Sequence, residues 1–435
     1  MTPPSASRRG ALLTLACVAL ACSSVDVVAR LQGDQGADAG EGRVAFCEGA
    51  PLIFGEGAET RCLPRLPAQL FRYATCACEG IVATDLRTDS FDSTRGAFSA
   101  PGETGGAVGV NGRINAGGNW TIGGSLTASG DWTGAAELRV ARDLRLDGRL
   151  VGPLVHVDRN ADVNGDVQVD DLRIGGQLRV PAGATVNAPA SDVGGTLEES
   201  VNVEPPCGCG GEERLNIAAF VASVRADNDN GDGLSPTALA NVLSTETLRL
   251  ECGRYYLDSV GATAPITLRI AGRVAIFVEN DLAADALTIE LEDGGELDFF
   301  IAGNIVSAGD LRIGRPESPA SVRLYVGGAG TINLQSEARL AANLYAPDAQ
   351  LVLAAETEVF GALFARRIDA ESLRVHFDTS VSRTDSACPT PSRCDRCDQC
   401  PPVQGCVDGA CAACRDDADC CAPLVCNDGT CEPDG

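Results

Sequence analysis

The chain has 435 residues, of which only 4% are aromatic, and its 50 glycines suit a thin stacked sheet better than a bulky globular core. Its formal net charge of −26 argues against binding to nucleic acids or anionic membrane surfaces, because both need a basic surface. All 34 basic residues are Arg, so the absence of Lys excludes Schiff-base chemistry and phosphate binding by a P-loop.

Residues 1–22 have the organisation of an export signal. Arg8 and Arg9 precede an apolar stretch, residues 11–21, that is too short for a permanent transmembrane helix. The stretch ends in Ala-Leu-Ala before Cys22 and resembles a bacterial lipoprotein signal, which implies cleavage and lipidation of Cys22. Simple secretion after cleavage by an ordinary signal peptidase is the alternative. Residues 23–42 are rich in Gly, Asp and Ala, and we expect them to form a flexible tether.

Residues 43–100 contain four cysteines: Cys47, Cys62, Cys76 and Cys78. In an exported protein this number predicts two disulfides. Because Cys76 and Cys78 are too close to bridge to each other comfortably, we expect each to pair with one of the two preceding cysteines. The segment is predicted to cap the N-terminal end of a solenoid.

Residues 101–200 are predicted to form a first β-solenoid. Similar rows begin at intervals of 18, 18, 17 and 17 residues, at Thr104, Ile122, Val140, Val157 and Ile174. Within a row, small or aliphatic residues recur at every second position, which indicates strands, and Gly, Asn and Asp clusters supply the turns. A short repeat of this kind is typical of a β-helix. Trp120 and Trp132 are expected to fill its wide end; a sugar-stacking face is the alternative.

Residues 201–244 are predicted to link two solenoid units. Cys207 and Cys209 mark its start, and apolar spacing over residues 215–226 predicts a short helix. Asn228, Asn230 and Asp232 then alternate like the first ligands of an EF-hand loop, but Leu239 stands where a bidentate Glu is needed. We therefore expect an Asx-rich turn, with a calcium site as the alternative.

Residues 245–380 contain strand-like runs at intervals of 19 to 25 residues and are predicted to form a second β-solenoid unit. Four segments, Cys252–Tyr256, Gly303-Asn304, Leu344–Pro347 and Gly361–Phe364, resemble a domain of unknown function found in type IV pilus-assembly proteins of the PilX type. The resemblance implies a solenoid fold and an envelope or surface role, and it supplies no catalytic residues.

Residues 381–435 form a Cys-rich tail that has almost no apolar residues to bury. Such a segment is predicted to be a disulfide scaffold, and the run from Cys414 to Cys431 resembles a cystine-knot mini-domain. Cysteine parity predicts one long-range bridge from the set of Cys207, Cys209 and Cys252 to the tail, through Cys388. The tail cysteines are Cys388, Cys394, Cys397, Cys400, Cys406, Cys411, Cys414, Cys420, Cys421, Cys426 and Cys431.

Together these features predict a mostly β protein with two successive β-solenoid units, a short linking helix and disulfide-rich caps. We expect a non-enzymatic, cell-envelope lipoprotein with a structural or adhesive binding role, anchored through Cys22 at the outer membrane or cell surface. Its partner is expected to be a protein or glycan, with no cofactor and no metal. The alternatives are a polysaccharide-acting β-helix enzyme, and a secreted protein whose tail is an inhibitor-like binding module. The two histidines, His156 and His376, do not complete a recognisable catalytic set.

Overall fold

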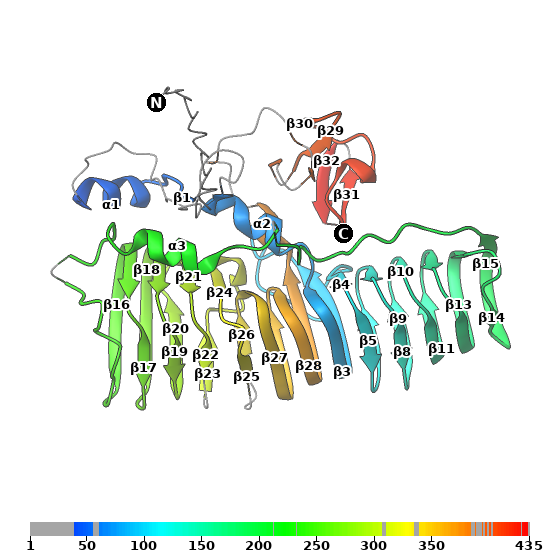
Figure 1. Ribbon diagram of the computed structural model, residues 1–435, viewed down its shortest axis with the longest axis horizontal. Helices are drawn as coiled ribbons and strands as arrows, with labels where there is room; N and C mark the ends of the chain where they lie inside the picture. Colours follow the sequence, from blue (N-terminus) through cyan, green and yellow to red (C-terminus); the bar gives the residue numbers. More distant parts are fainter. Residues whose placement is uncertain are drawn as a thin grey trace, which may run out of the picture.

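Most of the chain forms one long β-solenoid in the computed structural model of the protein (Figure 1). The structure describes residues 39–54, 61–211, 213–231, 233–306, 310–334, 339–383, 388, 394, 396–397, 400–401, 403–427 and 429–433. The predicted export signal, Cys22 and nearly all of the predicted tether lie outside these residues. The predicted mostly β, solenoid-type architecture is confirmed.

Each coil of the solenoid has three sides. One coil consists of β4 (Val108–Val110), β5 (Arg113–Ala116) and β6 (Trp120–Ile122), and the next of β7 (Leu126–Ala128), β8 (Trp132–Gly134) and β9 (Glu137–Val140). Parallel pairing places each strand beside the strand 18 residues earlier. An inward-pointing residue therefore recurs every six residues, and the whole series is fully buried: Val108, Ile114, Trp120, Leu126, Trp132, Leu138, Leu144 and Leu150.

The remaining strands continue this pattern in two half-stacks. The first half-stack, residues 75–198, begins with β3 (Thr75–Phe91) and ends with β10 (Leu144–Leu146), β11 (Leu150–Val157), β12 (Ala161–Val163), β13 (Val167–Val180), β14 (Val186–Asn187) and β15 (Ala190–Glu198). The second half-stack, residues 246–378, contains β16 (Glu246–Leu257), β17 (Val260–Ala262), β18 (Ile266–Val278), β19 (Leu282–Ala284), β20 (Ala286–Leu291), β21 (Glu296–Ile301), β22 (Ile305–Val306), β23 (Asp310–Ile313), β24 (Val322–Val326), β25 (Thr331–Leu334), β26 (Arg339–Ala341), β27 (Asn343–Phe360) and β28 (Leu363–Asp378).

The two half-stacks join into one continuous stack in an order that differs from the chain order. The last strand of the second half-stack, β28, pairs in parallel with β3 along almost its whole length, from Leu363 beside Thr75 to Asp378 beside Phe91. The chain thus enters the stack in its middle, builds outward to β15, and resumes at the opposite end with β16 (Figure 1). The prediction that residues 43–100 cap the N-terminal end is wrong for β3, because both edges of this strand are paired within the stack.

One face of the second half-stack is covered by segments from outside the sheet. They include α1 (Ala39–Cys47), the short hairpin of β1 (Ile53–Phe54) and β2 (Arg61–Cys62), α2 (Leu66–Leu70) and α3 (Ile217–Val224) (Figure 1). Aromatic rings fill the contact: Phe54 stacks on Phe220 at 4.1 Å, and both pack against Phe300. Beneath this cover, β18, β21 and β24 therefore contain runs of consecutive buried residues, with side chains buried on both faces of the sheet.

A return segment connects the two half-stacks. This strap, residues 199–216, runs along the solenoid from β15 toward α3, as Figure 1 shows in green. The helix that follows begins at Ile217, where the Asn216 side chain accepts a hydrogen bond from the Ala219 N–H and so caps the first turn.

The two ends of the stack differ. At the β16 end, residues 227–242 close the last coil and bury Leu234, Leu239 and Val242. At the other end, β15 forms the last rung, and Val186 and Leu197 remain 42% and 41% exposed.

The disulfide-rich tail lies beside the middle of the stack and contains two hairpins, β29 (Gly405–Val407) with β30 (Ala410–Ala412) and β31 (Leu424–Asn427) with β32 (Thr430–Pro433) (Figure 1).

Candidate binding site at the centre of the stack

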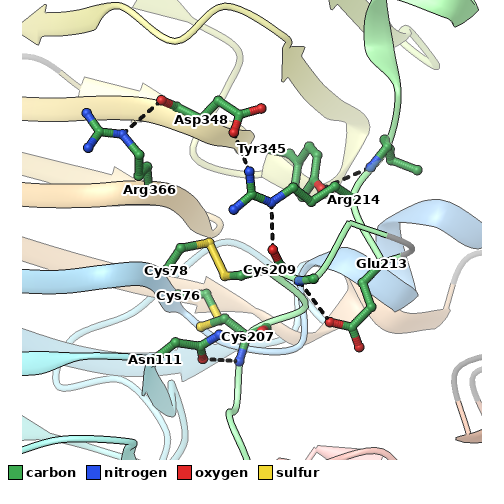
Figure 2. The surroundings of a disulfide bond; sticks show 12 residues. Cys76, Cys78, Asn111, Cys207, Cys209, Glu213, Arg214, Tyr345, Asp348 and Arg366 are labelled. Atoms are coloured by element: carbon green, nitrogen blue, oxygen red, sulfur yellow. Dashed lines mark hydrogen bonds and ion pairs between the residues drawn. A yellow bond between two sulfur atoms is a disulfide. The ribbon is translucent and has the colours of Figure 1, made fainter.

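Two disulfides attach the strap to the central strand β3. Cys76 pairs with Cys207 and Cys78 with Cys209, each across 131 residues of sequence (Figure 2). The Asn111 side chain completes the attachment, since its amide both donates to the Cys207 carbonyl (2.8 Å) and accepts from the Cys207 N–H (2.9 Å). The strap is thus fixed at the rung where the two half-stacks meet.

Polar contacts extend this attachment to β27 and β28. The Arg214 guanidinium donates to the Cys209 carbonyl (2.7 Å) and pairs with Asp348, whose backbone carbonyl accepts from Arg366 (3.0 Å) (Figure 2). The buried Tyr345 hydroxyl accepts the Leu215 N–H at 3.2 Å. Burial raises the pKa of Tyr345 to about 12, so the hydroxyl stays protonated at neutral pH.

The N-terminal segment is attached by two further bonds, Cys47–Cys252 and Cys62–Cys388. The predicted pairing within residues 43–100 is therefore wrong. The predicted bridge from the Cys207, Cys209 and Cys252 set to Cys388 is also wrong, because Cys388 pairs with Cys62. The reason is the order of the strands: β3 lies beside β28 and beneath the strap, so its cysteines face partners that are distant in sequence.

The tail consists of two tandem copies of one four-cysteine unit. Cysteines recur with successive spacings of 6, 6 and 5 residues, first from Cys394 to Cys411 and again from Cys414 to Cys431. In each unit the first cysteine pairs with the third and the second with the fourth: Cys394–Cys406, Cys400–Cys411, Cys414–Cys426 and Cys420–Cys431. Cys397–Cys421 joins the two units. The run from Cys414 to Cys431, which resembles a cystine-knot mini-domain, therefore has one cysteine, Cys421, whose partner lies outside the run. The repeated spacing is a signal that the sequence analysis missed.

A cavity of about 270 Å³ lies between this tail and the central coils. Corner glycines of the first half-stack, among them Gly106 and Gly124, line one side. Phe377, near the end of β28, and Ser382, in the turn that follows it, line another. Val403, Pro423 and Glu432 of the tail complete the wall. The cavity is therefore assembled from three parts of the chain that are far apart in sequence.

Arg72 contributes a positive charge to the wall of this cavity. It follows α2 and lines the cavity, and within the described part of the chain its guanidinium has no hydrogen-bonding or ionic partner. The neighbouring Tyr73 is buried, and this burial raises the pKa of its hydroxyl to about 12 despite the opposing effect of Arg72. Among the wall residues that the structure describes, the second Arg is Arg95, whose Nη1 lies 3.7 Å from Oε1 of Glu103.

The structure separates the residues singled out for sugar stacking and acid–base chemistry. Trp120 and Trp132 are fully buried inside the coils, so the sugar-stacking alternative is wrong. His156 is a surface residue beside Asp158, at 3.2 Å. His376 is buried at the rung where β28 meets β3, with Nδ1 at 2.6 Å from Asp89 and Nε2 at 3.5 Å from Glu358. Phe98 and Phe360 cover its ring, which gives this pair a packing role.

The calcium candidate lies in the loop that closes the β16 end. The Asn228 side-chain oxygen accepts the Asn230 N–H, as in an Asx turn, and the Asn230 amide is paired with the backbone of Tyr256 in both directions. The third candidate, Asp232, lies outside the described residues. The nearby Asp229 carboxylate is bound to Arg254 at 3.0 Å.

Residues 210–384 match a family described as a domain of unknown function, DUF7305. The matched region begins directly after the strap cysteines and contains α3, the loop that closes the β16 end and the whole second half-stack. No curated protein and no solved structure matches the chain. Among the described helices, none has the length and apolar character needed to cross a membrane.

Proposed function

We propose that this protein is a non-enzymatic, disulfide-locked rod of the cell envelope, anchored through lipid on Cys22, that presents a binding site at its centre. One observation carries the proposal: all cysteines of the predicted mature body, from Cys47 to Cys431, are joined in nine disulfides. A framework of this density is formed and kept in oxidising compartments outside the cytoplasm.

The arrangement of the bonds supports a rigid display role. Three of them attach α1 and the strap to the stack, one joins the N-terminal hairpin to Cys388 at the start of the tail, and five cross-link the tail itself. A reaction centre needs free nucleophiles or paired titratable groups at a solvent-accessible site. The buried His376, which is paired with Asp89, lies beneath the rings of Phe98 and Phe360 and is not accessible to a substrate, which favours binding over catalysis. The resemblance of residues 252–364 to PilX-type pilus-assembly proteins supports an envelope location.

The first experiment is fractionation of the envelope followed by mass analysis of the N-terminal peptide. We expect a peptide that starts at Cys22 and carries acyl chains, in the outer-membrane fraction. An unmodified N-terminus with the protein in the medium would contradict the anchor and favour secretion. A protein with free thiols in the cytoplasmic fraction would contradict the proposal as a whole.

A further inference from the structure

We propose that the central cavity binds one residue of a neutral glycan. This inference deepens the proposed binding role and rests on it. The cavity is near the lower end of the size range for small-ligand sites, at about 270 Å³, which suits a single sugar unit better than a larger ligand. The tail part of its wall is held by disulfides, among them Cys420–Cys431, and the opposite part consists of paired coils, which favours a pre-formed site.

The polar groups of the cavity include both donors and acceptors. Arg72 supplies guanidinium N–H groups that have no partner in the described part of the chain. The N–H of Gly106, a buried residue of the wall, likewise has no partner among the described residues. Since a buried N–H group is rarely left without a hydrogen bond, a bound hydroxyl or water completes it. Asp92, Glu103 and Glu432 supply carboxylate acceptors.

The charges select a neutral ligand. Three carboxylates and two guanidinium groups are found among the described residues of the wall, and one ion pair, Arg95–Glu103, lies at its exposed edge. An anionic sugar would face a net negative wall, whereas vicinal hydroxyls can donate to carboxylates and accept from Arg72 at once. Val403, Pro423 and Phe377 add apolar surface, which suits the apolar face of a pyranose ring.

Binding is tested by calorimetry on the purified, oxidised protein. The probes are three neutral trisaccharides, maltotriose, cellotriose and chitotriose, with trigalacturonate as the anionic comparison. We expect at least one neutral probe to bind more tightly than trigalacturonate. Failure of all neutral probes at millimolar concentration, or preference for trigalacturonate, would overturn the inference.

Two variants locate the site. Arg72→Ala should weaken binding by about tenfold or more, because hydrogen bonds to a charged group are stronger than those between neutral groups. Val403→Trp fills the cavity from the half-exposed tail side, so it should abolish binding without changing the melting temperature. The matched control is Arg269→Ala, an exposed Arg paired with Glu290 on the second half-stack. Unchanged affinity in both cavity variants would overturn the site, whereas the envelope location is decided separately by fractionation.

Discussion

At the scale of single residues, the Asp229–Arg254 pair holds the closed end of the stack. Arg254 is 1% exposed and the Asp229 side chain is fully buried. The carboxylate accepts from the guanidinium at 3.0 and 3.1 Å and from the Arg254 backbone N–H at 2.7 Å. These contacts fasten the loop that closes the β16 end to the edge of β16.

Removing this carboxylate should open that end. We expect Asp229→Ala to cost about 3–5 kcal/mol, because it leaves a buried guanidinium without its main partner. Chemical denaturation measures the loss, and hydrogen exchange should show faster exchange at β16. The control Glu290→Ala removes an exposed partner of Arg269 and should cost less than about 1 kcal/mol. Equal costs for the two variants would contradict the role of burial.

Buried tyrosines predict a loss of stability at high pH. Burial raises the pKa of Tyr73 and of Tyr345 to about 12 in the folded protein, against 10 as the ordinary value. The folded state therefore holds these protons more tightly than the unfolded state between pH 10 and 12. The stability linked to these two protonated hydroxyls is fully present below pH 10. The free energy of unfolding falls as pH rises through 12, by about 3 kcal/mol for each group.

Denaturation at pH 9 and pH 11.5, with intact disulfides, measures this loss. Tyr345→Phe should flatten the dependence, since the variant has no proton to lose at this position. A tyrosine absorbance titration of the folded protein should show ionisation of both residues well above pH 10. Ordinary ionisation near pH 10 with no loss of stability would contradict the prediction.

At the scale of single elements, a column of glycines shapes one corner of the first half-stack. A Cβ added at Gly148 would lie 2.6 Å from the backbone of Gly130 and of Asp131, and a Cβ at Gly165 would lie 2.7 Å from the backbone of Gly148. The corner is therefore too narrow for any side chain, and coils stack here backbone on backbone.

We expect Gly148→Ala to destabilise the protein by about 1–3 kcal/mol, because the added methyl group must displace the backbone of the coil beneath it. Gly195→Ala is the matched control: it lies in β15, has no atom within 4 Å of the added Cβ, and does not need a positive φ. Denaturant midpoints of the two variants provide the comparison. A control as destabilised as Gly148→Ala would show that glycine loss alone is responsible.

The sequence predicts these elements well and their pairing poorly. The alternation around Leu126 and Leu144 is local, so strands and turns can be inferred from it. The finer six-residue series that includes both tryptophans was overlooked because the 17- to 18-residue rows dominate the pattern. Which strand lies beside β3 depends on contacts with residues almost 300 positions away, and no local pattern encodes them.

At the scale of the whole molecule, the four disulfides that are not confined to the tail all join the chain before the strap to the strap or to the chain after it. Cys47, Cys62, Cys76 and Cys78 all precede the strap, and their partners lie within or beyond it. The β28–β3 pairing adds a continuous sheet across the same boundary. A continuous backbone between β15 and Cys207 is thus not needed to hold the two parts of the chain together.

This redundancy can be tested by cutting the strap. A protease site inserted after the exposed Ser200 should be cleavable in the folded protein, and the product should migrate as one species without reductant and as two fragments with it. We expect the oxidised, cleaved protein to keep its melting temperature within a few degrees. Separation into fragments without reductant would contradict the cross-linking shown here. An insertion after the exposed Gly294, whose fragments are bridged by Cys62–Cys388 alone, provides the comparison.

The central position of β3 has a consequence for how the molecule is made. Synthesis from the N-terminus produces β3 early, but its neighbour β28 appears almost 300 residues later. During that interval a 17-residue parallel strand has one edge without its native partner, and such edges readily pair with other chains. Cys76 and Cys78 can be joined to the strap as soon as Cys209 is available, long before β28 exists. These two bonds would keep β3 attached to the strap in the unfinished half-stack until β28 pairs with the free edge of β3.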